Sequence, residues 1–401
     1  MKLIVPNGPL TGEIELPVSK SIANRLQIIA ALAGTKIPFP DSVPEDVKAL
    51  RDALRATTTE VNVGMAGTAM RFLTAYFSIA EERQVLLVGG KRMHQRPIGD
   101  LVEALQLLGA EVSYLEEFGY PPLHIQGKPL LGGTINMSAS ISSQFVSALM
   151  MIAPKMKNGL TIQLEGNVLS RPYIELTADC MRQCGIDVRF EGNTIRIPAG
   201  EYQVPNLEIE ADWSAASYFY ALAAARPNSK FLLKGLKLSS SQGDSILKEW
   251  FSEMGITSVQ KEKGVEISSK ETINFPNSID FTNNPDLAQT FAFLAATLGK
   301  SLALTGLDNL RFKETDRVKA LKRELKKLGV YAAIRGDSLS IYDSISCDKA
   351  CIETHNDHRM AMGAAVLATI IPTEIRNPEV TRKSFPGFMD QLLKVAVERM
   401  D

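Results

Sequence analysis

Long apolar segments, each preceded by a short polar turn, recur along the chain. Each is apolar around its whole circumference when read as a helix, so each is expected to be buried. From the second segment on, their polar starts are about 72 residues apart, which indicates an internal repeat with a shortened first copy. The six starts are Ser21, Thr68, Ser143, Ser214, Asp286 and His358.

A second unit lies between the apolar segments. It reads as an amphipathic helix, a glycine that ends the helix, and a β-strand. Hairpin turns are indicated at "EGNT" and "RGDS". The whole repeat is then strand, buried helix, strand, amphipathic helix, strand, strand, used about six times, which predicts an α/β fold. The helix-ending glycines are Gly109, Gly185, Gly255 and Gly329.

The starts of the buried helices carry an unusual set of polar side chains. In a symmetric repeat these helices run alike, and their N-termini gather on one side, where free N–H groups attract anions. Ser and Asp there could be simple caps, but Lys20 and Arg359 are cations at the positive end of a helix dipole. The residues at these starts are Lys20, Ser21, Arg25, Thr68, Arg71, Ser142, Ser143, Gln144, Asp286, His358 and Arg359.

The stretch "NLRFKETDR" (309–317) concentrates charge at a predicted strand-to-helix turn. An apolar stripe predicts a helix that begins near Thr315 and ends at Gly329. Lys313 and Glu314 then lie in the turn before it. Together with the polar helix starts, this placement favours a site that handles phosphorylated anions over a solvated charge cluster.

Composition limits the possible partners and cofactors. With 44 Lys+Arg against 45 Asp+Glu in 401 residues, nothing attracts the whole chain to nucleic acid or to an anionic membrane. No signal segment or membrane-length apolar run is visible, so we expect a cytoplasmic protein, and a monomer. The four cysteines form two C-x3-C pairs and are expected to be free and mostly packed. "HNDH" lacks an evident third ligand, so no metal and no cofactor are expected.

An ordered series of short motifs resembles the 5-enolpyruvylshikimate-3-phosphate synthases. The resemblance covers nearly the whole chain, and the order of the motifs makes it specific. The motifs are "PVSKSIANR", "AGTAMR", "QRPIGDLVEAL", "YPPL", "SISSQF", "SRPYIELT", "ADWSAASYF", "SQGD", "NPD", "NLRFKETDR", "THNDHRMAM" and "KSFPGF".

This resemblance implies a fold and a division of the chain. The family forms a two-domain inside-out α/β barrel, in which each domain has three repeats, with helices inside and sheets outside. It implies one lobe at 15–211 and a discontinuous lobe formed by 1–14 and 212–401, with the active site in the cleft between them.

The resemblance also implies a reaction and its residues. Phosphoenolpyruvate would transfer its enolpyruvyl group to the 5-hydroxyl of shikimate 3-phosphate, in the shikimate pathway of aromatic amino acid biosynthesis. Asp286 would act as the base and Glu314 as the acid, and Lys20 would also be catalytic. Shikimate 3-phosphate would contact Lys20, Ser21, Arg25, Ser142, Ser143, Gln144, Ser170, Tyr173, Asp286, Asn309 and Lys313. Phosphoenolpyruvate would contact Lys20, Gly67, Arg96, Gln144, Arg317, Arg359 and Lys383.

Three positions depart from the family pattern. Met65 replaces the usual Asn beside the phosphoenolpyruvate site, which glyphosate also occupies; Phe72 replaces Pro, and Arg171 replaces Lys. With the short first repeat, these departures leave open a catalytically silent anion-binding paralogue. The related transferase that acts on UDP-N-acetylglucosamine is a second alternative, but no cysteine falls in the loop at 90–99 where that enzyme carries its acid.

Overall fold

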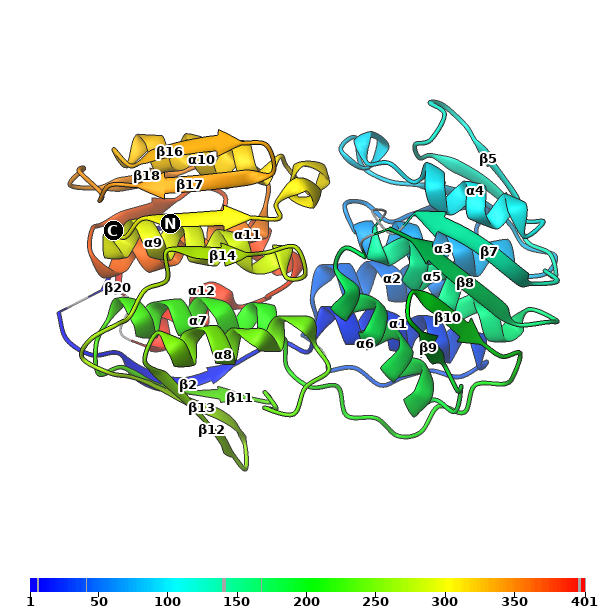
Figure 1. The fold of residues 1–401 in the computed structure, drawn as a ribbon, viewed down its shortest axis with the longest axis horizontal. Coiled ribbons are helices and arrows are strands. Elements are labelled where there is room, and N and C mark those ends of the chain that lie inside the picture. The colour runs from blue at the N-terminus through cyan, green and yellow to red at the C-terminus, as the bar shows by residue number, and fades with distance from the viewer. Residues whose placement is uncertain (6, 41, 139–141, 167, 396–397, 401) are drawn as a thin grey trace. The chain divides into compact units, whose positions relative to one another are not determined.

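A computed structural model describes residues 1–5, 7–40, 42–138, 142–166, 168–395 and 398–400. By packing, the chain divides into two units (Figure 1). The first unit is Met1–Ser19 with Glu210–Asp401, and the second is Lys20–Ile209. The lobe boundaries implied by resemblance, after residues 14 and 211, stay a prediction. The first two residues of the "SISSQF" motif lie outside the described residues.

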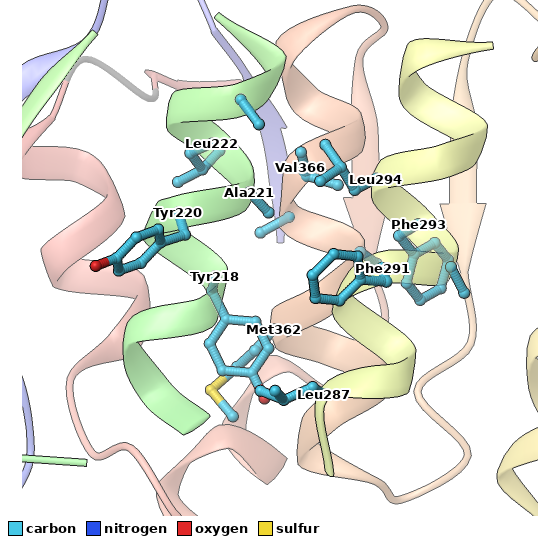
Figure 2. Close-up of a cluster of buried hydrophobic side chains, with 14 of the residues drawn as sticks. Tyr218, Tyr220, Ala221, Leu222, Leu287, Phe291, Phe293, Leu294, Met362 and Val366 are labelled. Carbon is cyan, nitrogen blue, oxygen red and sulfur yellow. The ribbon is translucent and has the colours of Figure 1, made fainter. Parts of the chain in front are cut away.

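The six predicted buried helices are present, three in each unit. All are rich in apolar residues and bury most of their length, so they form the centres of two separate hydrophobic cores. In the first unit, aromatic and aliphatic side chains of these helices pack on one another (Figure 2). The helices are α1 (Lys20–Leu32), α3 (Gly67–Ser78), α5 (Ser143–Ile152), α7 (Trp213–Ala225), α9 (Ala288–Leu298) and α11 (His358–Ala364).

The amphipathic helices end where the glycines predict. Gly109, Gly185, Gly255 and Gly329 all have positive φ, a conformation that glycine adopts without a steric penalty. The last of these helices starts at Arg317 rather than near Thr315, because the side chain of Asp316 accepts the Lys319 N–H and caps it. The remaining helices are α2 (Glu45–Arg55), α4 (Gly99–Leu107), α6 (Arg171–Gln183), α8 (Leu247–Glu253), α10 (Arg317–Lys327) and α12 (Phe388–Lys394).

Two four-stranded sheets belong to the second unit. One has the order β3-β4-β6-β5 and the other β7-β8-β10-β9. The hairpin predicted at "EGNT" joins β9 and β10 as an antiparallel pair. The strands are β3 (Glu60–Asn62), β4 (Gln84–Val88), β5 (Glu111–Tyr114), β6 (Leu123–Gln126), β7 (Gly133–Ser138), β8 (Leu160–Glu165), β9 (Arg189–Glu191) and β10 (Thr194–Ile197).

Three more four-stranded sheets belong to the first unit, in the orders β12-β13-β11-β2, β14-β15-β17-β16 and β18-β19-β1-β20. The hairpin predicted at "RGDS" joins β16 and β17. The strands are β1 (Lys2–Ile4), β2 (Thr11–Glu15), β11 (Lys230–Lys234), β12 (Ile256–Lys261), β13 (Gly264–Ser269), β14 (Ser278–Asp280), β15 (Leu302–Thr305), β16 (Tyr331–Arg335), β17 (Ser338–Tyr342), β18 (Ala350–Ile352), β19 (Thr373–Ile375) and β20 (Glu398–Met400).

The first repeat is the exception. A strand follows each of the other five buried helices before the next α-helix begins, namely β4, β8, β11, β15 and β19. Between α1 and α2, the described residues 33–40 and 42–44 contain no strand. The shortened first repeat therefore contributes its two helices without a sheet of its own.

Candidate active site

A buried arginine organises the charged residues of the first unit. Arg317, at the start of α10, is 1% exposed. Its Nε donates to Asp357 Oδ2 at 2.7 Å, and its Nη1 donates to Asp286 Oδ1 at 3.0 Å. Its Nη2 donates to Glu314 Oε2 at 3.0 Å and to Asp357 Oδ1 at 3.3 Å. One planar guanidinium thus fixes three carboxylates, a geometry for which arginine is suited.

The charge of Arg317 is secured by these neighbours. Burial alone would lower its pKa, but Asp357, and then Glu314 and Asp286, raise the pKa above the ordinary arginine value. The guanidinium therefore stays protonated at any pH at which the protein is folded.

Asp286 lies in a single 3-10 turn, Pro285–Leu287, directly before α9. Besides Arg317, its carboxylate contacts Arg359 Nη2 at 2.6 Å and Lys313 Nζ at 4.0 Å. Arg359 Nη1 also donates to the Asp286 carbonyl at 3.2 Å. The candidate base is thus oriented by cations from three segments, and its carboxylate stays 21% exposed and reachable.

Glu314, the candidate acid, lies in the turn before α10. Its Oε1 contacts Lys383 Nζ at 2.9 Å, and its Oε2 accepts from Arg317. Since Arg317 contacts both carboxylates, the candidate acid and base share one rigid anchor. Asn309 belongs to the 3-10 segment Asp308–Phe312 immediately before Lys313.

A further carboxylate, Asp244, was not assigned a role from the sequence. It is 4% exposed, accepts from the Ser214 hydroxyl, and accepts from Asn284 Nδ2 at 3.3 Å. Burial, and then the nearby charge of Asp286, raise the pKa of Asp244. Asp244 is therefore protonated more readily than an ordinary carboxyl, and its charge is linked to that of the candidate base.

The raised pKa of Asp244 predicts a pH-dependent stability. A carboxyl whose pKa is raised by folding favours the folded state at low pH, and this contribution fades as pH rises from about 4, the unfolded value, through the raised value. Asp244→Asn should therefore gain free energy of unfolding relative to wild type as pH rises from 4 to 7, measured by urea unfolding. A pH-independent difference would contradict the raised pKa.

In the second unit, the start of α1 brings two predicted residues into defined contacts. Lys20 Nζ lies 3.2 Å from Asp46 Oδ2 on α2. Arg25 is 2% exposed and donates to the Ser21 carbonyl at 2.8 Å and to the Tyr173 carbonyl at 2.9 Å. Burial lowers the pKa of Arg25 to about 10, which still leaves it charged near neutrality. Arg25 thus holds two other predicted shikimate 3-phosphate contacts in place.

Phe72, one of the departures from the family pattern, contributes to the same region. It is fully buried on α3, and the Arg25 guanidinium carbon lies 5.6 Å from its ring centroid. Such a cation–π contact stabilises a buried guanidinium. Phe72 therefore supports Arg25 rather than only filling the core.

At the start of α3, two arginine side chains lie close to the helix N-terminus. Arg96 is 6% exposed, yet its Nε and Nη1 have no hydrogen-bond partner in the described structure. A Cβ on Gly67 would lie 2.5 Å from Arg96 Nη1 and 2.8 Å from Arg71 Nη1. Glycine therefore lets two guanidinium groups approach the N-terminus of a helix, where N–H groups also favour an anion.

The close approach at Gly67 predicts a binding defect. Gly67→Ala should push Arg96 away from the helix and raise the KM for phosphoenolpyruvate by about tenfold, the loss of roughly one charge-assisted hydrogen bond. Gly99→Ala is the matched control, because Gly99 also begins a helix but its added Cβ would meet nothing closer than 3.4 Å. Equal KM values for Gly67→Ala and wild type would argue against Arg96 as a ligand.

The remaining predicted residues lie on two helix starts. Ser142 caps α5 by accepting the Gln144 N–H, and Gln144 Nε2 donates to Thr68 Oγ1 at 3.2 Å, which links α5 to α3. Ser143 and Ser170 are buried, and Ser170 has a φ of 54°, a conformation uncommon outside glycine. The second unit therefore gathers its predicted residues at the N-termini of α1, α3, α5 and α6.

Three acidic residues of the charged clusters were missed by sequence reasoning. Asp46 pairs with Lys20, Asp357 pairs with Arg317, and Asp244 accepts from Ser214 and Asn284. Only Asp357 offered a signal, because it stands two residues before Arg359 in "HNDHR". Asp46 is 26 residues from Lys20 in the chain, and no local pattern links the two.

The predicted packing of the cysteines is only half right. Cys180 and Cys184 are buried, whereas Cys347 is partly buried and Cys351 is exposed at the edge strand β18.

Among the described residues, no three His, Cys, Asp or Glu side chains come together as a metal site would require. Nor does any helix in the described ranges have both the length and the apolar character needed to cross a membrane.

Comparison with known proteins gives a consistent result. The family model for EPSP synthase (3-phosphoshikimate 1-carboxyvinyltransferase) matches residues 45–392. A 3-phosphoshikimate 1-carboxyvinyltransferase of Bacteroides fragilis is 42% identical over 398 residues, which cover 98% of this chain and 97% of the relative. One of Colwellia psychrerythraea is 35% identical over 422 residues, with 98% of each chain covered.

A solved structure supports the fold. An EPSP synthase from Acinetobacter baumannii superposes with a TM-score of 0.78 and 22% identity, covering 99% of each chain. This likeness confirms the predicted α/β fold in two domains, and the sequence matches confirm the predicted family. The chain belongs to the EPSP synthase family of 3-phosphoshikimate 1-carboxyvinyltransferases.

Proposed function

We propose that this chain transfers the enolpyruvyl group of phosphoenolpyruvate to the 5-hydroxyl of shikimate 3-phosphate and releases phosphate. Within this family, the observation that carries the proposal is the Arg317 network. It holds two carboxylates, Asp286 and Glu314, on one buried guanidinium and surrounds them with Lys313, Arg359 and Lys383. An acid, a base and several cations are what this reaction needs.

The proposed steps are an addition and an elimination. Glu314 gives a proton to the methylene carbon of phosphoenolpyruvate, and Asp286 takes the proton of the attacking hydroxyl, whose oxygen bonds to the carbon that bears the phosphate. Loss of phosphate and of one methyl proton from the tetrahedral intermediate restores the double bond. Positioned acid and base groups of this kind commonly accelerate proton transfer by 10²- to 10⁴-fold, as an order of magnitude.

The anionic groups of the substrates find cations in both units. In the second unit we propose that Arg96 and the N-terminus of α3 bind phosphoenolpyruvate, with Lys20 and Gln144. In the first unit we assign that role to Arg317, Arg359 and Lys383. Shikimate 3-phosphate would use Lys20, Ser21, Arg25, Ser142, Ser143, Gln144, Ser170, Tyr173, Asp286, Asn309 and Lys313.

The reaction is tested by phosphate release. Purified protein should release inorganic phosphate when shikimate 3-phosphate and phosphoenolpyruvate are both present, and neither substrate alone should give release above the rate without enzyme. Equal release from phosphoenolpyruvate alone would point to a different enzyme. No release with both substrates would favour the silent paralogue.

Location and assembly belong to the same proposal. We propose a cytoplasmic monomer, since the substrates are small metabolites and no other partner is needed for the chemistry. Light scattering on the purified chain tests the mass, for which a monomer is 43.9 kDa. Cell fractionation tests the location.

A further inference from the structure

A cavity lies beside the two helices of the first repeat, which has no sheet of its own. Its volume is about 260 Å³, and it lies among α1, α2 and α3 and the segment that joins α1 to α2. All of its lining residues belong to the second unit. The lining residues are Gln27, Ala30, Ala31, Gly34, Thr35, Lys36, Ile37, Phe39, Arg51, Leu54, Arg55 and Tyr76.

The cavity is separate from the candidate active site. On α1 it contacts Gln27, Ala30 and Ala31, whereas Lys20 is the first residue of that helix. The seven residues from Lys20 to Gln27 correspond to about 10 Å along the axis. None of the residues assigned above to substrate binding lines it.

The charge of the lining has one sign. Lys36, Arg51 and Arg55 contribute three cations, and the described residues that line the cavity include no Asp or Glu. Arg51 is incompletely satisfied: its Nε makes no hydrogen bond in the described structure and lies 3.8 Å from Asp52 Oδ1. A partly buried guanidinium in this state favours an anionic partner.

The rest of the lining is apolar and includes two aromatic rings. Ile37, Phe39, Leu54 and Tyr76 supply the apolar surface. Small-molecule sites commonly combine such walls with a few polar groups and enclose roughly 300–1,000 Å³. A cavity slightly below that range suits one or two fused rings that carry a single charged group.

We propose that this cavity binds a small aromatic carboxylate. Its rings would pack against Phe39, Leu54 and Tyr76, and its carboxylate would face the three cations, with Arg51 completing its hydrogen bonds. The site exists because the shortened first repeat leaves α1 and α2 without the sheet that accompanies each other pair of helices.

The proposal is tested with 2-naphthoate and the full chain by titration calorimetry, in the presence of saturating shikimate 3-phosphate to occupy the candidate active site. We expect one site. The double variant Lys36→Gln/Arg55→Gln should weaken binding at least tenfold, and Ala31→Phe should abolish it by filling the cavity. Arg189→Gln, an exposed arginine of the same unit, should bind as wild type does.

Several results would overturn the proposal. Equal binding of the neutral 2-naphthamide would make the cavity an apolar hole rather than an anion site. Equal affinity of wild type and the double variant would place the ligand elsewhere, and so would full displacement by shikimate 3-phosphate. If 2-naphthoate does not bind at millimolar concentration, the proposed site does not exist. Because catalysis does not enter these measurements, they stay independent of the proposed reaction.

Discussion

Glu314→Gln is expected to lower kcat by about 10²–10⁴, since the amide cannot deliver a proton to the methylene carbon. The amide has nearly the same shape as the carboxyl, and its single oxygen can still accept from either Arg317 or Lys383, though not from both, so the site should keep most of its geometry. Steady-state phosphate release at saturating concentrations of both substrates measures the effect. Asp286→Asn should cause a loss of the same order, because its amide cannot accept the hydroxyl proton.

Two controls separate loss of chemistry from loss of structure. Glu191→Gln removes a carboxylate from an exposed ion pair on β9 and should leave kcat unchanged. Calorimetric titration of Glu314→Gln with shikimate 3-phosphate should give an affinity within a few-fold of wild type, because Glu314 is not among its proposed contacts. Near-full kcat in Glu314→Gln would rule out Glu314 as the proton donor.

The helical framework could be predicted because its signals are local. A buried helix such as α9 is apolar on all sides, and this pattern stands out without any knowledge of its neighbours. The glycines that end the amphipathic helices are equally local signals, as at Gly185 and Gly329. The start of α10 was misplaced by two residues because Asp316 and Thr315 can each cap a helix, and only the observed Asp316 contact decides between them.

The charged network could not be predicted, because it joins residues far apart in the chain. Arg317 and Asp357 are 40 residues apart, and Arg359 and Asp286 are 73 apart. No periodicity links such pairs, so sequence reasoning assigned Asp286 and Arg359 to separate tasks. The Lys20–Asp46 ion pair was not predicted for the same reason, because Asp46 has the pattern of an ordinary acidic residue in the first turn of α2.

The structure gives Arg317 a second role besides the contact with phosphoenolpyruvate that the resemblance implies. Its Nε and both Nη atoms donate to Asp357, Asp286 and Glu314, and it is 1% exposed. It therefore positions the candidate acid and base before any substrate arrives. A residue with that role should affect kcat as well as KM.

Arg317→Ala is accordingly expected to lower kcat at least a hundredfold, besides raising the KM for phosphoenolpyruvate, and to destabilise the first unit. Removing one partner from a buried ionic cluster costs about 3–5 kcal/mol, because Asp357, fully buried, would be left without the donor to its Oδ2. Arg323→Ala, on the exposed face of the same helix, is the control and should change neither quantity. Urea unfolding measures stability, and phosphate release measures the kinetic constants.

Millimolar guanidinium should restore part of kcat of Arg317→Ala by refilling the space that the side chain leaves, whereas a purely structural collapse would not respond. If only KM changed, Arg317 would be a ligand for phosphoenolpyruvate and not the anchor of the acid and base.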